Sequence, residues 1–219
     1  MSTRRTPFEL LLALAITAAL PTLLWATLYV WLAHGYAWSV AVEVLALCLL
    51  LVVLRRGGRP VSTAFAVRPI HRRGAAIAAA VPLAYLVPIT VWAFLNAPPL
   101  GTLAPGAELL IWRTELAWLP ALYLLLIAPV CEELLFRGFI FRVLSQSLPG
   151  PVLAALISSL GFALAHAHNG GAAQLLVFVE ALVLCYVVRR SGSVLYGMLA
   201  HFINNAYAAL AMLLMAAAY

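Results

Sequence analysis

The sequence predicts an all-α fold, a polytopic integral membrane bundle of about seven transmembrane helices. Its 219 residues are 66% hydrophobic and 9% charged, whereas a soluble domain is nearer half apolar and a quarter charged. Apolar runs long enough to cross a bilayer recur along the chain, and arginine is concentrated in alternate connections between them. We therefore expect one membrane domain over residues 1–219.

A transmembrane helix needs about 20 apolar residues. The segments of this kind are 8–33, 36–54, 74–95, 116–146, 151–167, 172–188 and 194–218. Arg4 and Arg5 precede the first one, as in a signal peptide, but its apolar run is longer than a signal sequence needs, so we expect a retained helix. An extra membrane-inserted segment within 96–115 stays open, although its Pro and Gly content argues against a helix.

The arginines set the orientation, because cytoplasmic loops are enriched in basic residues. With the N-terminus in the cytoplasm, eleven of the thirteen arginines fall on the cytoplasmic side: Arg4, Arg5, Arg55, Arg56, Arg59, Arg68, Arg72, Arg73, Arg142, Arg189 and Arg190. Arg113 falls outside, and Arg137 lies within a span. We expect a multi-pass protein of the cell (inner) membrane with its C-terminus outside. Since the arginines flank apolar runs, the net charge of +6 indicates topology and not a nucleic-acid partner.

The charged residues are restricted in kind, which excludes some chemistry. Every basic residue is Arg and every acid is Glu. A P-loop, which needs Lys, is absent, and so is any site built from two aspartates. The three cysteines lie in apolar stretches without metal-ligand spacing and are interpreted as small buried residues. Carboxylates within a bilayer are costly and usually functional, so each Glu is a candidate.

The densest polar cluster within an apolar run is Cys131-Glu132-Glu133-Leu134-Leu135-Phe136-Arg137. Glu133 and Arg137 are four residues apart, in the favourable order for a helical ion pair. Glu132 points about 100° away. We expect Glu133 to pair with Arg137 and Glu132 to be a free carboxylate that faces a cavity. The alternative is that both acids only neutralise Arg137.

Two later segments also place polar groups one helical turn apart. Phe162 and His166 lie at the end of the fifth span, and His201 and Asn205 share one face of the seventh. Alone, the first pair is more typical of a histidine whose hydrogen bonds are satisfied at a helix end. The second pair is equally compatible with a functional site and with helix–helix hydrogen bonding. Glu132 and His166 lie at similar distances from the 149–151 turn, so at 1.5 Å per residue they reach nearly the same depth. His201 reaches that level if the helix pair projects past the membrane.

A carboxylate, two imidazoles and an amide inside a membrane suggest water activation beside a carbonyl. Glu132 with His166 would take a proton from water, and His201 with Asn205 would donate to the oxyanion. In a second version Glu132, His166 and His201 bind a metal such as Zn²⁺. The sequence leaves both versions open. It lacks H-E-x-x-H and G-x-S-x-G, the signatures of zincin and serine-hydrolase sites.

In this order on successive predicted helices, three motifs resemble those of the CPBP family: Glu132-Glu133-x-x-x-Arg137, Phe162-x-x-x-His166 and His201-x-x-x-Asn205. That family contains the type II CAAX prenyl endopeptidases and the bacteriocin-processing and Abi-type membrane proteins. The resemblance covers residues 116–219, whereas the spans within 8–115 match only in being hydrophobic.

The resemblance implies an intramembrane endopeptidase acting on a membrane-associated peptide or protein in contact with membrane lipid. It implies Glu132 as base with His166 beside it, and His201 and Asn205 as the oxyanion pair. Glu133, Arg137 and Phe162 would be secondary active-site residues. Members are commonly labelled metalloproteases, and a metal-independent glutamate mechanism is also proposed for the family, so zinc stays open.

Two other classes of function compete with the protease. A non-catalytic scaffold or an immunity or regulatory protein of the same fold would bind a partner and tolerate Glu132→Gln, because fold alone does not establish activity. A transporter or proton path would use the intramembrane acids, including Glu43 and Glu180, which have no assigned partner. The sequence shows no pair of broken helices in repeated halves, which argues against the transporter.

Overall fold

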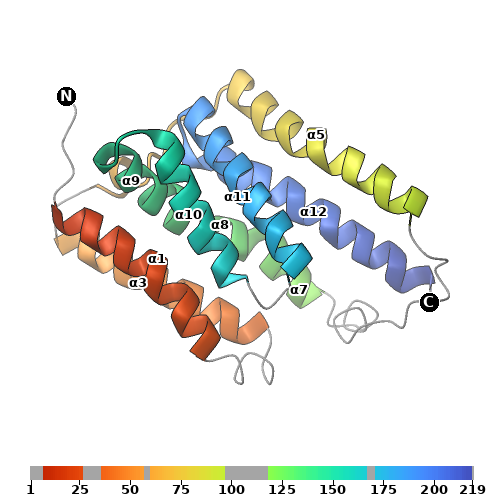
Figure 1. Ribbon diagram of the computed structural model, residues 1–219, viewed down its shortest axis with the longest axis horizontal. Helices are drawn as coiled ribbons and strands as arrows, with labels where there is room; N and C mark the ends of the chain where they lie inside the picture. The colour runs from red at the N-terminus through yellow and green to blue at the C-terminus, as the bar shows by residue number, and fades with distance from the viewer. Residues whose placement is uncertain (1–6, 27–35, 57–59, 97–117, 167–170, 219) are drawn as a thin grey trace.

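The computed structural model describes residues 7–26, 36–56, 60–96, 118–166 and 171–218. Within these ranges the ordered elements are all helices, as predicted. Figure 1 shows α1 (Pro7–Ala26) and α3 (Tyr36–Arg56) at one side of the molecule, α5 (Arg72–Asn96) at the other, and the remaining helices between them. Residues 97–117, with the segment left open as a membrane insertion, lie outside the described part, and so do His168, Asn169 and the Glu43 side chain.

The helix bounds follow the apolar segments closely. The first three long helices and one short helix are α1 (Pro7–Ala26), α3 (Tyr36–Arg56), α4 (Val61–Ala64) and α5 (Arg72–Asn96). The next helix continues without a break through α7 (Trp118–Leu122), η2 (Tyr123–Ile127), α8 (Ala128–Glu132), η3 (Glu133–Phe141) and α9 (Arg142–Ser147). The last three are α10 (Pro151–Ala165), α11 (Gly171–Ser191) and α12 (Val194–Ala218).

The turn between α9 and α10 makes these helices a close antiparallel pair. Gly150 adopts φ +122°, a conformation that only glycine reaches without strain. Pro151 then begins α10, where its missing N–H costs no hydrogen bond. The hairpin that the sequence predicts at 149–151 is therefore present, and it fixes the relative height of residues on the two helices.

Packing places the composite helix α7–α9 at the centre. Its η3 segment contacts α1, α10, α11 and α12, and α8 contacts α3 and α12. On the two sides, α1 packs against α10, and α5 packs against α11 and α12. The buried side chains between them are mainly aliphatic and aromatic, and Leu135, Phe139 and Ile140 of η3 are almost fully enclosed. The central helix is thus surrounded by protein on several faces.

One described segment, Arg72–Val91, combines the length and the apolarity that a membrane crossing takes. Three other apolar stretches are shorter: Pro7–Leu20, Val44–Arg55 and Pro151–Ala165. Helix length and hydropathy in the described residues therefore do not confirm seven spans, and that number stays a prediction.

Candidate active site

The central helix widens where it carries its acids. The segments η2 and η3 are π-helical, and α8 between them is a single α-turn that ends at Glu132. A π-turn bonds residue i to residue i+5. Such turns are rare in proteins, and those that occur are frequently found at functional sites. Glu132 and Glu133 stand at the junction between α8 and η3. Both of them approach the same imidazole, that of His201, whereas the sequence predicts that they face apart.

The predicted ion pair between Glu133 and Arg137 is present and fully buried. Arg137 Nη1 donates to Glu133 Oε1 over 2.7 Å, with both side chains at 0% exposure. Arg137 Nη2 donates to the carbonyl of Ala181 on α11 over 3.3 Å. Glu133 Oε1 also lies 3.3 Å from His201 Nδ1, a contact that sequence spacing did not reveal. This carboxylate therefore joins the central helix to α12.

Glu132 lies between the two histidines. Its Oε1 is 3.7 Å from His166 Nε2, and its Oε2 is 3.7 Å from His201 Nε2. The residue is 4% exposed, and Oε2 has no hydrogen-bond partner among the residues that the structure describes. The depth argument made from sequence is thus confirmed for these three side chains, which come from α8, the end of α10 and α12. Glu132 is enclosed by imidazoles and is not a free carboxylate.

Hydrogen bonds on the far side of each ring define its tautomer. His166 Nδ1 lies 2.9 Å from the carbonyl oxygen of Phe162, which can only accept, so Nδ1 carries the hydrogen. His201 Nδ1 likewise faces a carboxylate oxygen of Glu133. In each neutral ring Nε2 then bears a lone pair. When both rings are neutral, each oxygen of Glu132 therefore has an acceptor nitrogen 3.7 Å away.

Phe162 packs against the polar cluster with an aromatic face. Its ring lies 4.5 Å from the His166 ring at 31°, and Arg137 Cζ is 4.3 Å above its centroid. It also meets the His201 ring edge-on at 6.1 Å. A cation over an aromatic ring is stabilised electrostatically, more so when it is desolvated. Phe162 thus contacts members of all three sequence motifs and limits how far His166 can rotate.

Asn205 has a partner that the sequence did not predict. Its Nδ2 donates to the carbonyl of Leu124 in η2 over 2.7 Å. In the π-register of this segment, Ala128 donates to Tyr123, so the next residue, Pro129, would donate to Leu124. Proline has no N–H, and the Leu124 carbonyl is left for the Asn205 amide. Asn205 thereby ties α12 to the central helix and keeps a second N–H for other use.

Glu180 on α11 adds a third carboxylate to this region. It interacts electrostatically with Glu132, Arg137, His166 and His201. Its Oε1 is buried and makes no hydrogen bond among the described residues. The sequence marked Glu180 as an intramembrane acid without a role, and only the packing of α11 against α10, α12 and η3 brings it to the cluster.

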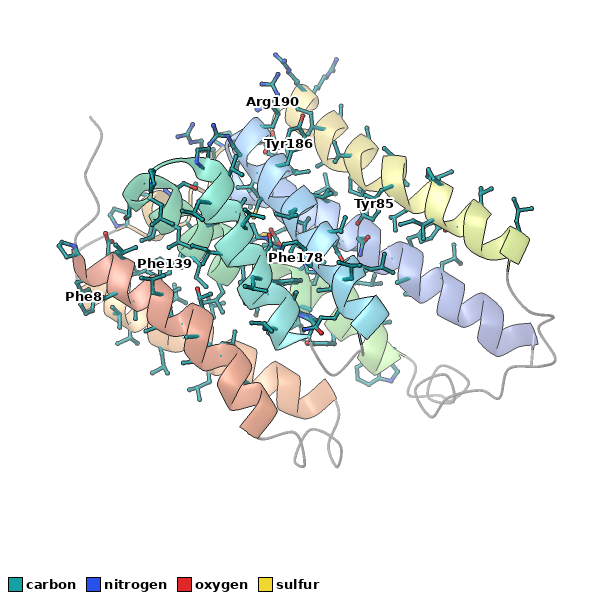
Figure 2. The ribbon with its side chains drawn as sticks, viewed as in Figure 1. Phe8, Tyr85, Phe139, Phe178, Tyr186 and Arg190 are labelled. Carbon is teal, nitrogen blue, oxygen red and sulfur yellow. The ribbon has the colours of Figure 1, made fainter. Side chains whose placement is uncertain are left out.

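A polar contact on α12 lies beside these acids. Tyr85 extends from α5 toward α12 (Figure 2), and its hydroxyl donates to Asn204 Oδ1 over 2.5 Å. Tyr85 also interacts electrostatically with Glu180. Asn204 lies next to Asn205 in the chain and about 100° around the helix from it, and this hydrogen bond gives Asn204 a separate partner on α5.

The donor types fit a zinc site in part. Two imidazoles and a carboxylate are acceptable ligands, and each ring has a hydrogen-bond acceptor at its other nitrogen, as metal-ligating histidines usually do. Within the described residues, however, no three His, Cys, Asp or Glu side chains form a group of metal-binding size.

Comparison with known proteins gives one match, and it covers the segment that carries these residues. Residues 112–207 match the family model described as Type II CAAX prenyl endopeptidase Rce1-like. Searches among curated proteins and among solved structures found no match. The match supports a protease function in a membrane-embedded family. The resemblance inferred from the three motifs is thus confirmed over residues 112–207, which are similar to the Rce1-like type II CAAX prenyl endopeptidase family model.

Proposed function

We propose that this protein is an intramembrane endopeptidase that hydrolyses a peptide bond of a membrane-associated protein or peptide with water activated by Glu132. The observation that carries the proposal is the position of Glu132, buried between His166 Nε2 and His201 Nε2 at 3.7 Å from each. Catalytic sites typically bury several ionisable groups beside one another, because burial and neighbouring charges adjust their protonation to the reaction.

The membrane arrangement belongs to the same proposal. Large apolar side chains are exposed on the outer helices, with Leu11 at 66%, Leu49 at 59% and Leu95 at 73%. Soluble monomers rarely expose contiguous apolar surface on this scale, so lipid contact explains it. We infer seven spans with the N-terminus in the cytoplasm and the C-terminus outside, as the arginine distribution predicts.

The acceptor geometry suggests how water is held. A water molecule placed beside Glu132 and His166 Nε2 donates one hydrogen to each of them. At 3.7 Å these pairs are beyond the length of a direct hydrogen bond, so we propose that a water molecule lies between the groups. One lone pair of that water is then free to attack a substrate carbonyl carbon.

The chemical step follows as general-base catalysis. As the water oxygen bonds to the carbonyl carbon, its proton passes to Glu132, with His166 beside it. The C–N bond of the tetrahedral intermediate then breaks, and the proton moves from Glu132 to the leaving amine nitrogen. No covalent enzyme intermediate is needed.

His201 and Asn205 are proposed to stabilise the oxyanion. In the neutral ring His201 Nε2 is an acceptor, so it donates to the oxyanion only as the imidazolium. The carboxylates of Glu132 and Glu133 lie 3.7 and 3.3 Å from this ring and stabilise a positive charge on it. The free N–H of Asn205 is the second donor.

In the alternative with a metal, Glu132, His166 and His201 would hold Zn²⁺, which would lower the pKa of bound water. Purified protein is assayed for peptide cleavage with and without a chelator, alongside metal analysis. Full activity in metal-free protein excludes this version, whereas activity that is lost with the metal and restored by adding Zn²⁺ establishes it.

The function is tested by Glu132→Gln, with Glu9→Gln as the matched control. Glu9 is a similarly buried acid, 5% exposed, on α1 and outside the cluster. Proteoliposomes containing each variant are incubated with prenylated and unprenylated membrane-anchored peptides, and products are measured by mass spectrometry.

We expect Glu132→Gln to lower the rate of cleavage at least 100-fold, the usual scale of a general base, and Glu9→Gln to retain the wild-type rate. Retained cleavage in Glu132→Gln would refute the assignment, and a cellular phenotype that survives this change would favour the scaffold.

A further inference from the structure

A cavity with several arginines lies beyond the catalytic cluster, on the far side of Arg137. It has a volume of about 230 Å³, and its polar lining residues are Arg68, Arg137, Arg142, Ser145, Gln146 and Arg189. We call it the arginine cavity. These residues come from the segment before α5, from η3 and α9, and from the last turn of α11. Nitrogen-tipped side chains gather at this end of the molecule, near the labelled Arg190 (Figure 2).

The charge of the cavity has one sign. No Asp or Glu is among the residues that line it. Arg137 is neutralised by Glu133 inside the protein, whereas Arg68 and Arg189 are exposed. Arg137 Nε is buried and has no hydrogen-bond partner in the described part of the chain. Arg137 is one of the residues that line the cavity, together with the three other arginines, and this concentration of guanidinium groups without an acid favours an anionic occupant.

The backbone that carries Arg68 is held firmly in place. The Arg68 N–H donates to Ser193 Oγ over 3.0 Å, and that hydroxyl donates back to the Arg68 carbonyl over 3.2 Å. Ser193 is completely buried, and Ala66 adopts a left-handed conformation, φ +55°, which is costly for a residue other than glycine. A Cβ on Gly192 would lie 3.7 Å from Arg68 Nη1, so the guanidinium lies against this glycine.

Guanidinium groups with nearby hydroxyl and amide groups match phosphate oxygens, because Arg presents paired N–H donors to them. The volume far exceeds the roughly 10–15 Å³ that one water molecule needs by the same measure. By the proposed orientation this end lies at the cytoplasmic surface, where basic pockets between transmembrane helices bind anionic headgroups. We propose that the arginine cavity binds the phosphate of an anionic phospholipid in the cytoplasmic leaflet.

Arginines near helix ends also set topology without binding anything, so the test separates the two roles. Arg189 lines the cavity, whereas its neighbour Arg190 is exposed on the same helix and does not. Arg189→Gln and Arg190→Gln remove the same charge at the same membrane depth. Purified variants are incubated with phosphatidylglycerol or with phosphatidylcholine of the same acyl chains, and bound lipid is measured by native mass spectrometry.

We expect phosphatidylglycerol to bind more tightly than phosphatidylcholine, and Arg189→Gln to weaken its binding about fivefold, the effect of one Arg near an anionic headgroup. Arg68→Gln should act similarly, and Arg190→Gln should leave binding unchanged. Equal loss in Arg189→Gln and Arg190→Gln, or equal binding of both lipids, would overturn the proposal. Occupancy by inorganic phosphate without a preference for phosphatidylglycerol would overturn the lipid as the source. Size-exclusion profiles matching the wild type show that each variant is folded.

Discussion

Replacing Arg137 by Met tests the buried ion pair most directly. The change removes the 2.7 Å partner of Glu133 and leaves that carboxylate at 0% exposure. Breaking a buried pair on one side costs about 3–5 kcal/mol. The Ala181 carbonyl also loses its donor, which adds about 1 kcal/mol. Because His201 Nδ1 stays 3.3 Å from Glu133 Oε1, part of the charge remains compensated, and we expect a loss of about 4 kcal/mol in the free energy of unfolding.

The assay is equilibrium unfolding by SDS in mixed micelles, followed by the fluorescence of the six tryptophans. The double variant with Glu133→Gln and Arg137→Met should lose less than the two single variants together, with a coupling of about 2 kcal/mol. Arg190→Met, at an exposed position on α11, is the control and should stay within about 0.5 kcal/mol of the wild type. Additive single effects would refute the reasoning, because they would mean that the two side chains do not depend on each other.

Three further changes probe the neighbours of this pair. Gly197→Ala places a methyl group against Glu133 Oε2 and 2.6 Å from Val188 Cγ2. We therefore expect the free energy of unfolding to fall by about 1–3 kcal/mol in the same assay. An unchanged unfolding midpoint would contradict the close contact. Asn205→Ala frees the Leu124 carbonyl and should cost about 1–3 kcal/mol. Adding Pro129→Ala restores a backbone donor and should recover stability but not cleavage; recovery of both would make Asn205 purely structural. Glu180→Gln should leave unfolding within about 0.5 kcal/mol, since Oε1 has no hydrogen bond to lose, but lower cleavage at least tenfold; equal loss of stability and cleavage would assign it to packing.

The helices could be predicted well from the sequence because apolar length is a strong signal. The predicted segments 36–54 and 74–95 correspond to α3 and α5, and the predicted break at 149–151 separates α9 from α10. Pro151 and the flanking proline and glycine mark that break locally. The π-helical register of the central helix was not predicted from the sequence. Its one local signal is Pro129, which has no backbone N–H to donate within the helix. The number of membrane crossings depends on the surroundings of each helix and not on its length alone.

At the site, spacing along helices predicted some contacts and missed others. The Glu133–Arg137 pair is local, four residues apart, and it follows from helix geometry. The approach of Glu132 to His166 follows from equal distances to a turn. The contact of Glu133 with His201 depends on how α12 packs against η3, which the sequence does not specify. Glu180 was visible as an intramembrane acid, but its place beside the cluster depends on the packing of α11.

The π-turns of the central helix also limit how its length can change. Each such turn holds one residue more than an α-turn between bonded groups, so η2 and η3 act as stored insertions. Deleting a single residue within η2 would return that turn to the α-register and leave the helical segments on either side of it in nearly the same relative orientation. The acids at 132 and 133 would then keep their neighbours on α10 and α12, whereas the π-turn that presents the Leu124 carbonyl to Asn205 would be lost. The extra residue in this stretch therefore serves the local backbone contact with α12.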